Sequence, residues 1–173
     1  VGEHHFCYTS GNSSPLVLLS HMAALTKRIR VGTSIICAPF HHPLRLAEEI
    51  CMLDHLSSGR FEFGIGRGAS PHEVAAHGRD PDDAVAAYIE AFEVLRQCFA
   101  ADTVRHAGRF WTLDDVPVPL KPLQRPHPPL WYAAATPDSV AWPARNGVNV
   151  ICGGPVARVP ELAERYRAEA AQD

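Results

Sequence analysis

Residues 29–68, IRVGTSIICAPFHHPLRLAEEICMLDHLSSGRFEFGIGRG, carry the pattern that decides the fold class. The first part, residues 29–38, is rich in β-branched side chains and stops at Pro39, as expected of a buried strand. A helix is predicted next, because apolar side chains recur at helical spacing before Gly59, at Leu46, Ile50, Leu53 and Leu56. RFEFGIGRG then predicts a second short strand that ends in glycines. This order predicts two parallel strands joined by a crossover helix.

The same alternation continues on both sides of this unit. Upstream, Ser14 as N-cap and Pro15 at the first position predict a helix over 15–28, whose apolar residues are Val17, Leu18, Met22 and Leu25. Downstream we expect a helix at about 80–100, a strand at 129–135, a helix at 136–146, a strand at 148–154 and a helix from about 159 to 171. Such alternation predicts an α/β protein, either an open doubly wound sheet or a (β/α)₈ barrel.

One segment interrupts this alternation. Residues 101–129 include the stretch TVRHAGRFWTLDDVPVPLKPLQRPHPP, which predicts two strands around Gly108 and a proline-rich return. We therefore expect residues 1–173 to form a single domain with an insertion at about 101–129. A complete barrel runs to about 250 residues, so if the fold is a barrel rather than an open sheet, we expect it to be incomplete at both ends. Its strand at 29–38 would be central, and its strand at 148–152 would be an open edge that favours aggregation or dimerisation.

Composition and charge narrow the classes of partner. The 173 residues are 46% hydrophobic and 20% charged, which is ordinary for a globular domain. The net charge is −3 and the basic residues are scattered, so neither nucleic acid nor a membrane surface is an expected partner. The five cysteines contain no C-x-x-C pair and are expected to be reduced core thiols. No apolar run reaches the roughly 18 residues of a membrane span, and no signal peptide opens the chain, so we expect a cytoplasmic protein.

The histidine pair in EHHF, residues 3–6, allows several interpretations. Neighbouring side chains of a strand face opposite sides, so His4 and His5 are not expected to hold one metal ion together, and we predict no metal site. One histidine could instead lie in the wall of the fold while the other covers a loop. Alternatively, an imidazole at a strand end can move a proton near neutral pH, which suits catalysis.

Two other strand ends each offer candidate phosphate-binding groups. FGIGRG lacks the third glycine and the immediate helix of a dinucleotide-binding loop, but Arg67 offers a cation for a phosphate, unless it forms a salt bridge at the rim. In AATPDSVAW, Thr136 and Ser139 place hydroxyls at a helix N-terminus, where an anion is favoured, although Thr136 would cap the helix in any case. Pro143 falls inside this helix and is expected to disturb it.

Taken together, these landmarks resemble the bacterial luciferase-like, flavin-dependent monooxygenases. The matching stretches are EHHF, TKRIRVGTSI, HHPLRLAEEICMLDHLSSGRFEFGIGRG, AGRFW and QRPHPPLWYAAATPDSVAWPARNG, which cover almost the whole chain in register. The resemblance implies a (β/α)₈ barrel, present here from the end of its second strand to about its sixth helix. It also implies that reduced FMN, or in some relatives a deazaflavin, binds at the carboxyl ends of the strands.

The resemblance also assigns residues. It places His4 beside the flavin, where it acts in the oxygen chemistry. Thr33 and Ser34 lie under the flavin, with a non-proline cis peptide at Ser34–Ile35, and the FMN phosphate lies at Thr136 and Ser139 against Arg67.

The implied activity is that of a flavin-dependent monooxygenase, which uses reduced FMN and O₂ to oxygenate a small organic substrate. A separate flavin reductase and a homodimeric or heterodimeric assembly are the implied protein partners. Two alternatives remain open: a deazaflavin-dependent dehydrogenase or reductase on the same barrel, and a flavin-binding chain without turnover.

Overall fold

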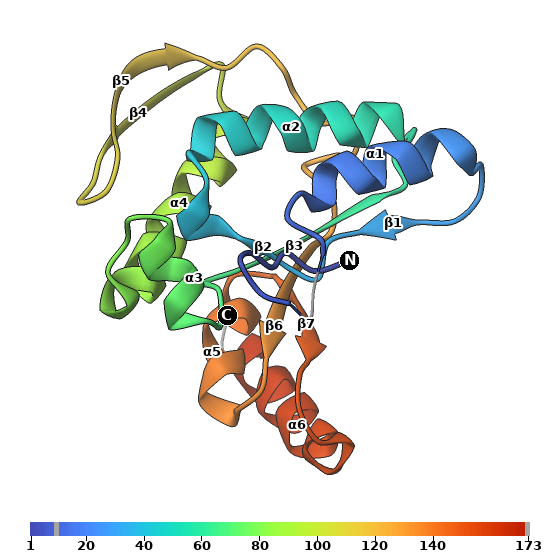
Figure 1. Ribbon diagram of the computed structural model, residues 1–173, viewed down its shortest axis with the longest axis vertical. Coiled ribbons are helices and arrows are strands. Elements are labelled where there is room, and N and C mark those ends of the chain that lie inside the picture. The colour runs from blue at the N-terminus through green and yellow to red at the C-terminus, as the bar shows by residue number, and fades with distance from the viewer. Residues whose placement is uncertain (9–10, 172–173) are drawn as a thin grey trace.

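The computed structural model describes residues 1–8 and 11–171 of the chain, and its centre is a parallel sheet (Figure 1). The strands are β1 (Val31–Gly32), β2 (Ile36–Cys37), β3 (Phe61–Gly66), β6 (Leu130–Ala134) and β7 (Asn149–Cys152). Their order is β1–β3–β6–β7, and β2 also pairs with β3. The helices of the described residues are α1 (Pro15–Leu25), α2 (Pro43–Leu56), α3 (Pro71–Ala76), α4 (Ala84–Ala100), α5 (Ala141–Arg145) and α6 (Val159–Ala170). Strands and helices alternate, as predicted.

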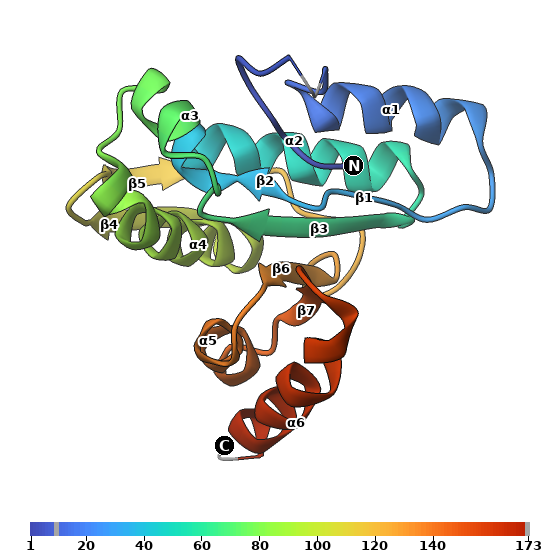
Figure 2. The same ribbon diagram turned by 60° about the horizontal axis from the view of Figure 1, so that its bottom comes forward.

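The sheet is curved into a half-barrel with the helices outside it. Figure 2 shows α1 and α2 on one side of β1–β3, and α5 and α6 beyond β6 and β7. Along β3 the side chains alternate: Phe61, Phe63 and Ile65 are fully buried in the core that includes residues of α1, α2 and α4. Glu62 and Gly66 therefore face the other side of the sheet.

The predicted strand at 29–38 differs from the structure in two ways. It is not one strand, because the pairs Gly32↔Glu62 and Ile36↔Ile65 leave three residues, 33–35, opposite two residues, 63–64. This extra residue is a bulge that separates β1 from β2. Nor is it central: β3 lies between β1/β2 and β6, while the other side of β1/β2 bonds to the N-terminal segment, through Ser34 N–H to Val1 O at 2.7 Å. The prediction that 148–152 forms an edge is confirmed by β7.

The apolar faces of α1 and α2 were predicted with different success. On α2, Leu46, Ile50 and Leu53 are buried as predicted, but Leu56 is exposed. On α1 the helix is confirmed, but the apolar residues named from the sequence are not the ones buried. Leu16, Leu19 and Ala23 are buried, whereas Val17, Leu18 and Leu25 are exposed and Met22 is partly buried. The sequence PLVLLSHMAAL is apolar on most sides of the helix, so periodicity alone does not select the buried face.

Two short helices also differ from the sequence-based expectation. The helix predicted over 136–146 begins as a 3₁₀ turn, Pro137–Val140, and continues as the five-residue α5, which contains the buried Pro143. The disturbance expected from Pro143 is consistent with this shortness, because proline lacks the N–H that would extend the hydrogen-bonding pattern. The next long helix after β3 begins near residue 80, as predicted, but the six-residue α3 precedes it and was not predicted.

The predicted two-stranded turn around Gly108 is confirmed. β4 (Thr103–Ala107) and β5 (Thr112–Pro117) form an antiparallel hairpin apart from the parallel sheet (Figure 1). Its tip is closed by Glu90 of α4, whose carboxylate accepts hydrogen bonds from the backbone N–H groups of residues 109–111. Burial raises the pKa of Glu90, but the hydrogen bonds to this carboxylate outweigh burial and lower the pKa below its ordinary value.

Three cysteines lie in the core, as predicted. Cys37, Cys51 and Cys98 are buried, and burial raises the pKa of the Cys37 and Cys51 thiols to about 12. Cys152, at the end of β7, is exposed instead. Thiols with such raised pKa values are inert at neutral pH, so the buried cysteines serve packing.

Candidate functional site

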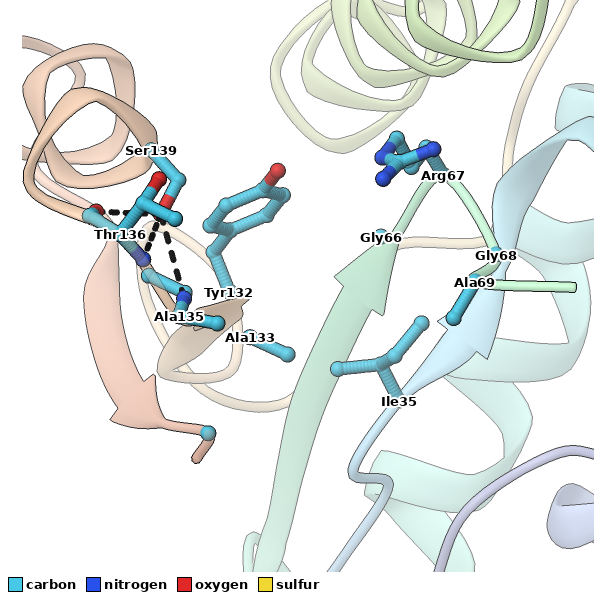
Figure 3. Close-up of a pocket in the computed structure, with 12 residues that line it drawn as sticks. Ile35, Gly66, Arg67, Gly68, Ala69, Tyr132, Ala133, Ala135, Thr136 and Ser139 are labelled. Carbon is cyan, nitrogen blue, oxygen red and sulfur yellow. Dashed lines mark hydrogen bonds between the residues drawn. The ribbon is translucent and has the colours of Figure 1, made fainter. Parts of the chain in front are cut away.

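A cavity of about 320 Å³ opens at the carboxyl ends of β3, β6 and β7. It is lined by Ile35, Gly66, Arg67, Gly68, Ala69, Tyr132, Ala133, Ala134, Ala135, Thr136, Ser139 and Gly153. Most of these side chains are small, which leaves the backbone accessible (Figure 3). The carboxyl ends of parallel strands are where α/β proteins bind ligands, so this cavity is the candidate site.

Three of the predicted cofactor-binding residues meet in this cavity. Arg67 follows the end of β3, while Thr136 and Ser139 lie in the turn after β6, on the other side of Tyr132 in Figure 3. The Arg67 side chain is exposed, and within the described part of the chain it has neither a hydrogen bond nor an ion pair. The alternative interpretation of Arg67 as a rim salt bridge therefore finds no partner among the described residues. A free guanidinium at a cavity mouth is available to an anionic ligand.

Tyr132 was not predicted and stands between the two halves of the cavity. Burial raises the pKa of its phenol, and the positive charge of Arg67 acts in the opposite direction. Its ring contacts Tyr88 of α4, with centroids 5.5 Å apart. Tyr132 lies in β6, and no motif in the sequence distinguishes it from a tyrosine that only packs in the core.

The hydroxyl of Ser139 is already used within its own turn. It accepts hydrogen bonds from the N–H groups of Ala135 and Thr136, at 3.2 and 3.1 Å, and donates one to Thr136 O at 2.6 Å. Ser139 thus fixes the shape of the turn that carries Thr136. The Ser139 N–H also donates within the turn, to Thr136 O at 3.0 Å, and Pro137 has no N–H, which leaves the Thr136 hydroxyl as the donor of this turn that lines the cavity.

Thr33 and Ser34 do not line this cavity. Thr33 is buried, and its hydroxyl donates to Gly64 O at 2.7 Å and accepts from Gly64 N–H at 2.8 Å. Ser34 is exposed, and the Ser34–Ile35 peptide bond is cis, as the family resemblance implied. Ile35, the residue after this bond, does line the cavity. Thr33 and Ser34 line a second cavity, of about 310 Å³, on the inner face of the sheet beside Glu62 and Trp131.

His4 and His5 contact different carboxylates, although residues 3–6 do not form the strand from which their divergence was predicted. His4 is outside the cavity lining; its ring is half exposed, and its Nδ1 lies 3.3 Å from Oε1 of Glu73. His5 is mostly buried and its Nε2 lies 3.0 Å from Oε1 of Glu3. The His5 ring also packs edge-on against His77, with centroids 4.5 Å apart. His5 therefore serves packing, whereas His4 remains accessible.

Glu3 is a buried carboxylate that the sequence analysis did not single out. It accepts hydrogen bonds from Cys37 N–H at 2.6 Å, from His41 Nε2 at 2.8 Å and from His5. Burial raises the pKa of Glu3, but these hydrogen bonds outweigh burial and lower it below its ordinary value. The charged carboxylate joins the N-terminal segment to the strand that carries the cis peptide.

Metal-binding clusters and membrane-spanning helices are both absent from the described residues. Residues 1–8 and 11–171 contain no group of three or more histidine, cysteine, aspartate or glutamate side chains placed to hold a metal ion. None of the helices in these ranges is both long and apolar enough to cross a membrane.

Comparison with known proteins assigns the family. The family model described as luciferase-like monooxygenase matches residues 1–173. The chain belongs to the luciferase-like monooxygenase family. A relative from Acinetobacter baylyi, the oxygenase component of a flavin-dependent trigonelline monooxygenase, is 36% identical over 152 residues, which are 87% of this chain and 42% of that protein. This luciferase-like chain spans about half the length of the curated relatives it matches.

Solved structures agree with this family. The crystal structure of the monooxygenase RslO1 from Streptomyces bottropensis matches with a TM-score of 0.91 and 34% identity, over 99% of this chain and 54% of that one. An F420-dependent secondary alcohol dehydrogenase, solved with an F420-acetone adduct, matches with a TM-score of 0.81 and 22% identity over 99% of this chain and 55% of that one. The second match, at this identity, shows a shared fold alone. The luciferase-like fold thus occurs in both kinds of enzyme, and the Acinetobacter relative and RslO1, both above 30% identity, are named monooxygenases.

Proposed function

We propose that this chain is part of a flavin-dependent monooxygenase that uses reduced FMN and O₂ to oxygenate a small organic substrate. The observation that carries the proposal is the Arg67 guanidinium, without a partner among the described residues, in a cavity at the carboxyl ends of parallel strands. The proposal is also supported by two similar proteins that are named monooxygenases. We further propose that residues 1–173 belong to one (β/α)₈ barrel domain, interrupted by the segment at about 101–129, and that the enzyme is cytoplasmic.

The donor set of the cavity fits the phosphate of a flavin nucleotide. Arg67 supplies a cation, Thr136 a hydroxyl, and Ser139 fixes the turn that carries Thr136. Thr33 and Ser34 shape the inner face of the sheet on which the isoalloxazine ring would lie, Thr33 through its two hydrogen bonds to Gly64. Reduced FMN, when bound, supplies the electrons that activate O₂.

His4 is the proposed catalytic residue. Its half-exposed ring can hold or move a proton, whereas the mostly buried ring of His5 is fixed by Glu3 and His77. General acid–base catalysis needs an accessible group that changes its protonation near the working pH. His5 is therefore the matched control within the same four residues.

The experiment compares His4→Ala with His5→Ala in the full-length protein. The probes are apolar aldehydes and cyclic ketones, and the readout is the fraction of consumed O₂ recovered as oxygenated product or as hydrogen peroxide. We expect His4→Ala to bind reduced FMN within a few-fold of the parent but to lose about 10²–10⁴-fold in oxygenation, the scale of a lost acid–base group. His5→Ala should mainly lower stability. Parental oxygenation by His4→Ala, or peroxide release from His5→Ala instead, would overturn the assignment.

Two protein partners belong to this proposal. A separate flavin reductase would supply reduced FMN; in support, the Acinetobacter relative is named as one component, the oxygenase, of its monooxygenase. A second subunit would cover the apolar side chains that α1 and α2 expose, which are Val17, Leu18, Leu25, Met52 and Leu56. Sedimentation of the full-length protein tests the dimer, because a charged side chain in place of Leu56 should shift it toward monomer.

A further inference from the structure

The accessible histidine of the N-terminal segment has a buried carboxylate as its partner. Nδ1 of His4 lies 3.3 Å from Oε1 of Glu73, a residue 69 positions further along the chain. The Glu73 side chain is only 7% exposed, whereas that of His4 is 52% exposed. The His4 backbone is also fixed, because its N–H donates to Asn12 O at 3.1 Å. The ring is thus held from one side and open on the other.

From this contact we propose that Glu73 is a positioning residue, which holds the His4 ring and keeps the proton on Nδ1. The inference rests on the proposed function, in which His4 acts on the substrate reaction. Because a carboxylate accepts only from a protonated nitrogen, the neutral ring paired with Glu73 carries its hydrogen on Nδ1 and has a free lone pair on Nε2. His4 then presents Nε2 as a proton acceptor toward its exposed side.

The position of Glu73 in α3 supports this role. Ser70 caps the helix by accepting from Glu73 N–H at 3.3 Å, and Pro71 occupies the first helical position. A glutamate at this third helical position commonly bonds back to the N-cap N–H in a capping box. In the described part of the chain, the recorded hydrogen bond of the Glu73 carboxylate goes to His4 instead. Val74, which is buried, anchors the helix that carries the carboxylate.

The other nearby carboxylate is not available to His4. Glu3 already accepts from Cys37 N–H, His5 and His41, and its side chain is fully buried. Each histidine is therefore bonded to a different carboxylate. Glu3 fixes His5 through Nε2 within the packed interior, and Glu73 holds His4 through Nδ1, which leaves Nε2 exposed.

Histidine tautomers report on this contact directly. In the full-length protein with ¹⁵N-labelled histidine, the signal of His4 is identified by its loss in His4→Ala. In the parent at alkaline pH we expect Nδ1 to be protonated and Nε2 to be free. Glu73→Gln should shift His4 toward the other tautomer and lower kcat for the aldehyde or ketone probe by about 10- to 100-fold, with KM within about threefold. Glu73→Asp, which keeps the charge but shortens the reach, should lose less.

A matched control separates positioning from stability. Glu169 of α6 is also buried and is ion-paired with Arg145 and Arg165, away from the site. Glu169→Gln should lower stability but leave the His4 tautomer and kcat unchanged. In the His4→Ala background, Glu73→Gln should cause no further loss of kcat, because Glu73 acts through His4.

Three results would overturn the inference: an unchanged tautomer in Glu73→Gln, independent losses in the double variant, or a tautomer change in Glu169→Gln. If Glu73→Gln does not fold, Glu73→Asp gives the same comparison, and a parental tautomer with parental kcat there would count against the role. Failure of the proposed function is a different outcome: parental oxygenation by His4→Ala, with the tautomer still controlled by Glu73.

Discussion

Replacing Arg67 by alanine tests the cofactor phosphate site. Arg67 is the cation of the cavity mouth and has no hydrogen bond or ion pair among the described residues, so the substitution removes no internal contact of that kind. A charge-assisted hydrogen bond to a phosphate contributes about 1.5–3 kcal/mol. Because the guanidinium is exposed and screened by solvent, the lower end applies, about 1.5 kcal/mol, or roughly a tenfold rise in Kd.

Riboflavin provides the matched ligand, since it shares the ring system of FMN and lacks the phosphate. The assay is anaerobic fluorescence or absorbance titration of the full-length protein with each reduced flavin at fixed ionic strength. Arg67→Ala should weaken FMN binding about tenfold and change riboflavin binding by less than about twofold. Higher salt should reduce the difference for the parent, because screening weakens charge attraction.

A second arginine controls for the overall loss of charge. Arg28 is exposed in the loop before β1, and Val31 of β1 pairs with Phe61 at the start of β3, whereas Arg67 follows the end of β3. Arg28→Ala removes one positive charge far from the cavity and should leave both titrations unchanged. Equal losses for FMN and riboflavin in Arg67→Ala, or an FMN loss in Arg28→Ala, would refute the phosphate assignment.

Further predictions concern stability. Gly64→Ala should destabilise the protein by about 3–5 kcal/mol in urea unfolding, because a Cβ would lie 2.1 Å from Thr33 O and would break the two hydrogen bonds between these residues. Gly11→Ala, with open space around it, is the control and should be neutral or slightly stabilising; equal effects would contradict the clash. The lowered pKa values of Glu3 and Glu90 mean that their stabilisation is complete above the ordinary value of 4.5 and is lost as the pH falls through the lowered values. Glu90→Gln should therefore lose less stability than the parent between pH 5 and pH 3, and parallel losses would count against this account.

The sequence predicted elements well where side-chain chemistry separates two faces. On α2, charged residues alternate with the apolar stripe, so the buried positions Leu46, Ile50 and Leu53 follow from periodicity. On α1, apolar residues surround the helix, and the packing partners decide which ones are buried. The bulge at 33–35 depends on the register against β3, which composition does not encode.

Short elements were harder to predict than long ones. The six residues of α3 are too few for a periodic pattern, although Ser70, Pro71 and Glu73 formed a helix-start signal that was available in the sequence. The hairpin around Gly108 was predicted from its turn residues, but the Glu90 contact that closes it was not. Contacts between residues far apart in the chain lie outside what local patterns report.

In the candidate site too, some residues were predicted from the sequence, whereas contacts between distant parts of the chain were not. The family resemblance implied that Arg67, Thr136 and Ser139 lie together, and all three line one cavity at the carboxyl ends of parallel strands. Glu3 and Glu73 were missed, since each acts on a histidine through a fold-dependent contact. His4 and His5 do contact different carboxylates, but the strand alternation from which this was predicted is absent at residues 3–6, and the identity of the partners required the structure.

Cofactor titration with oxygen measurement tests the central claim most directly. The full-length protein is titrated anaerobically with reduced FMN and, separately, with a reduced deazaflavin, and O₂ consumption by each complex is then followed in an oxygen electrode. A luciferase-like flavin monooxygenase is predicted to bind reduced FMN more tightly and to consume O₂ in proportion to the bound flavin. Tighter binding of the deazaflavin without O₂ uptake would contradict the account in favour of a dehydrogenase or reductase, and FMN binding without O₂ consumption would contradict it in favour of a flavin-binding protein without turnover.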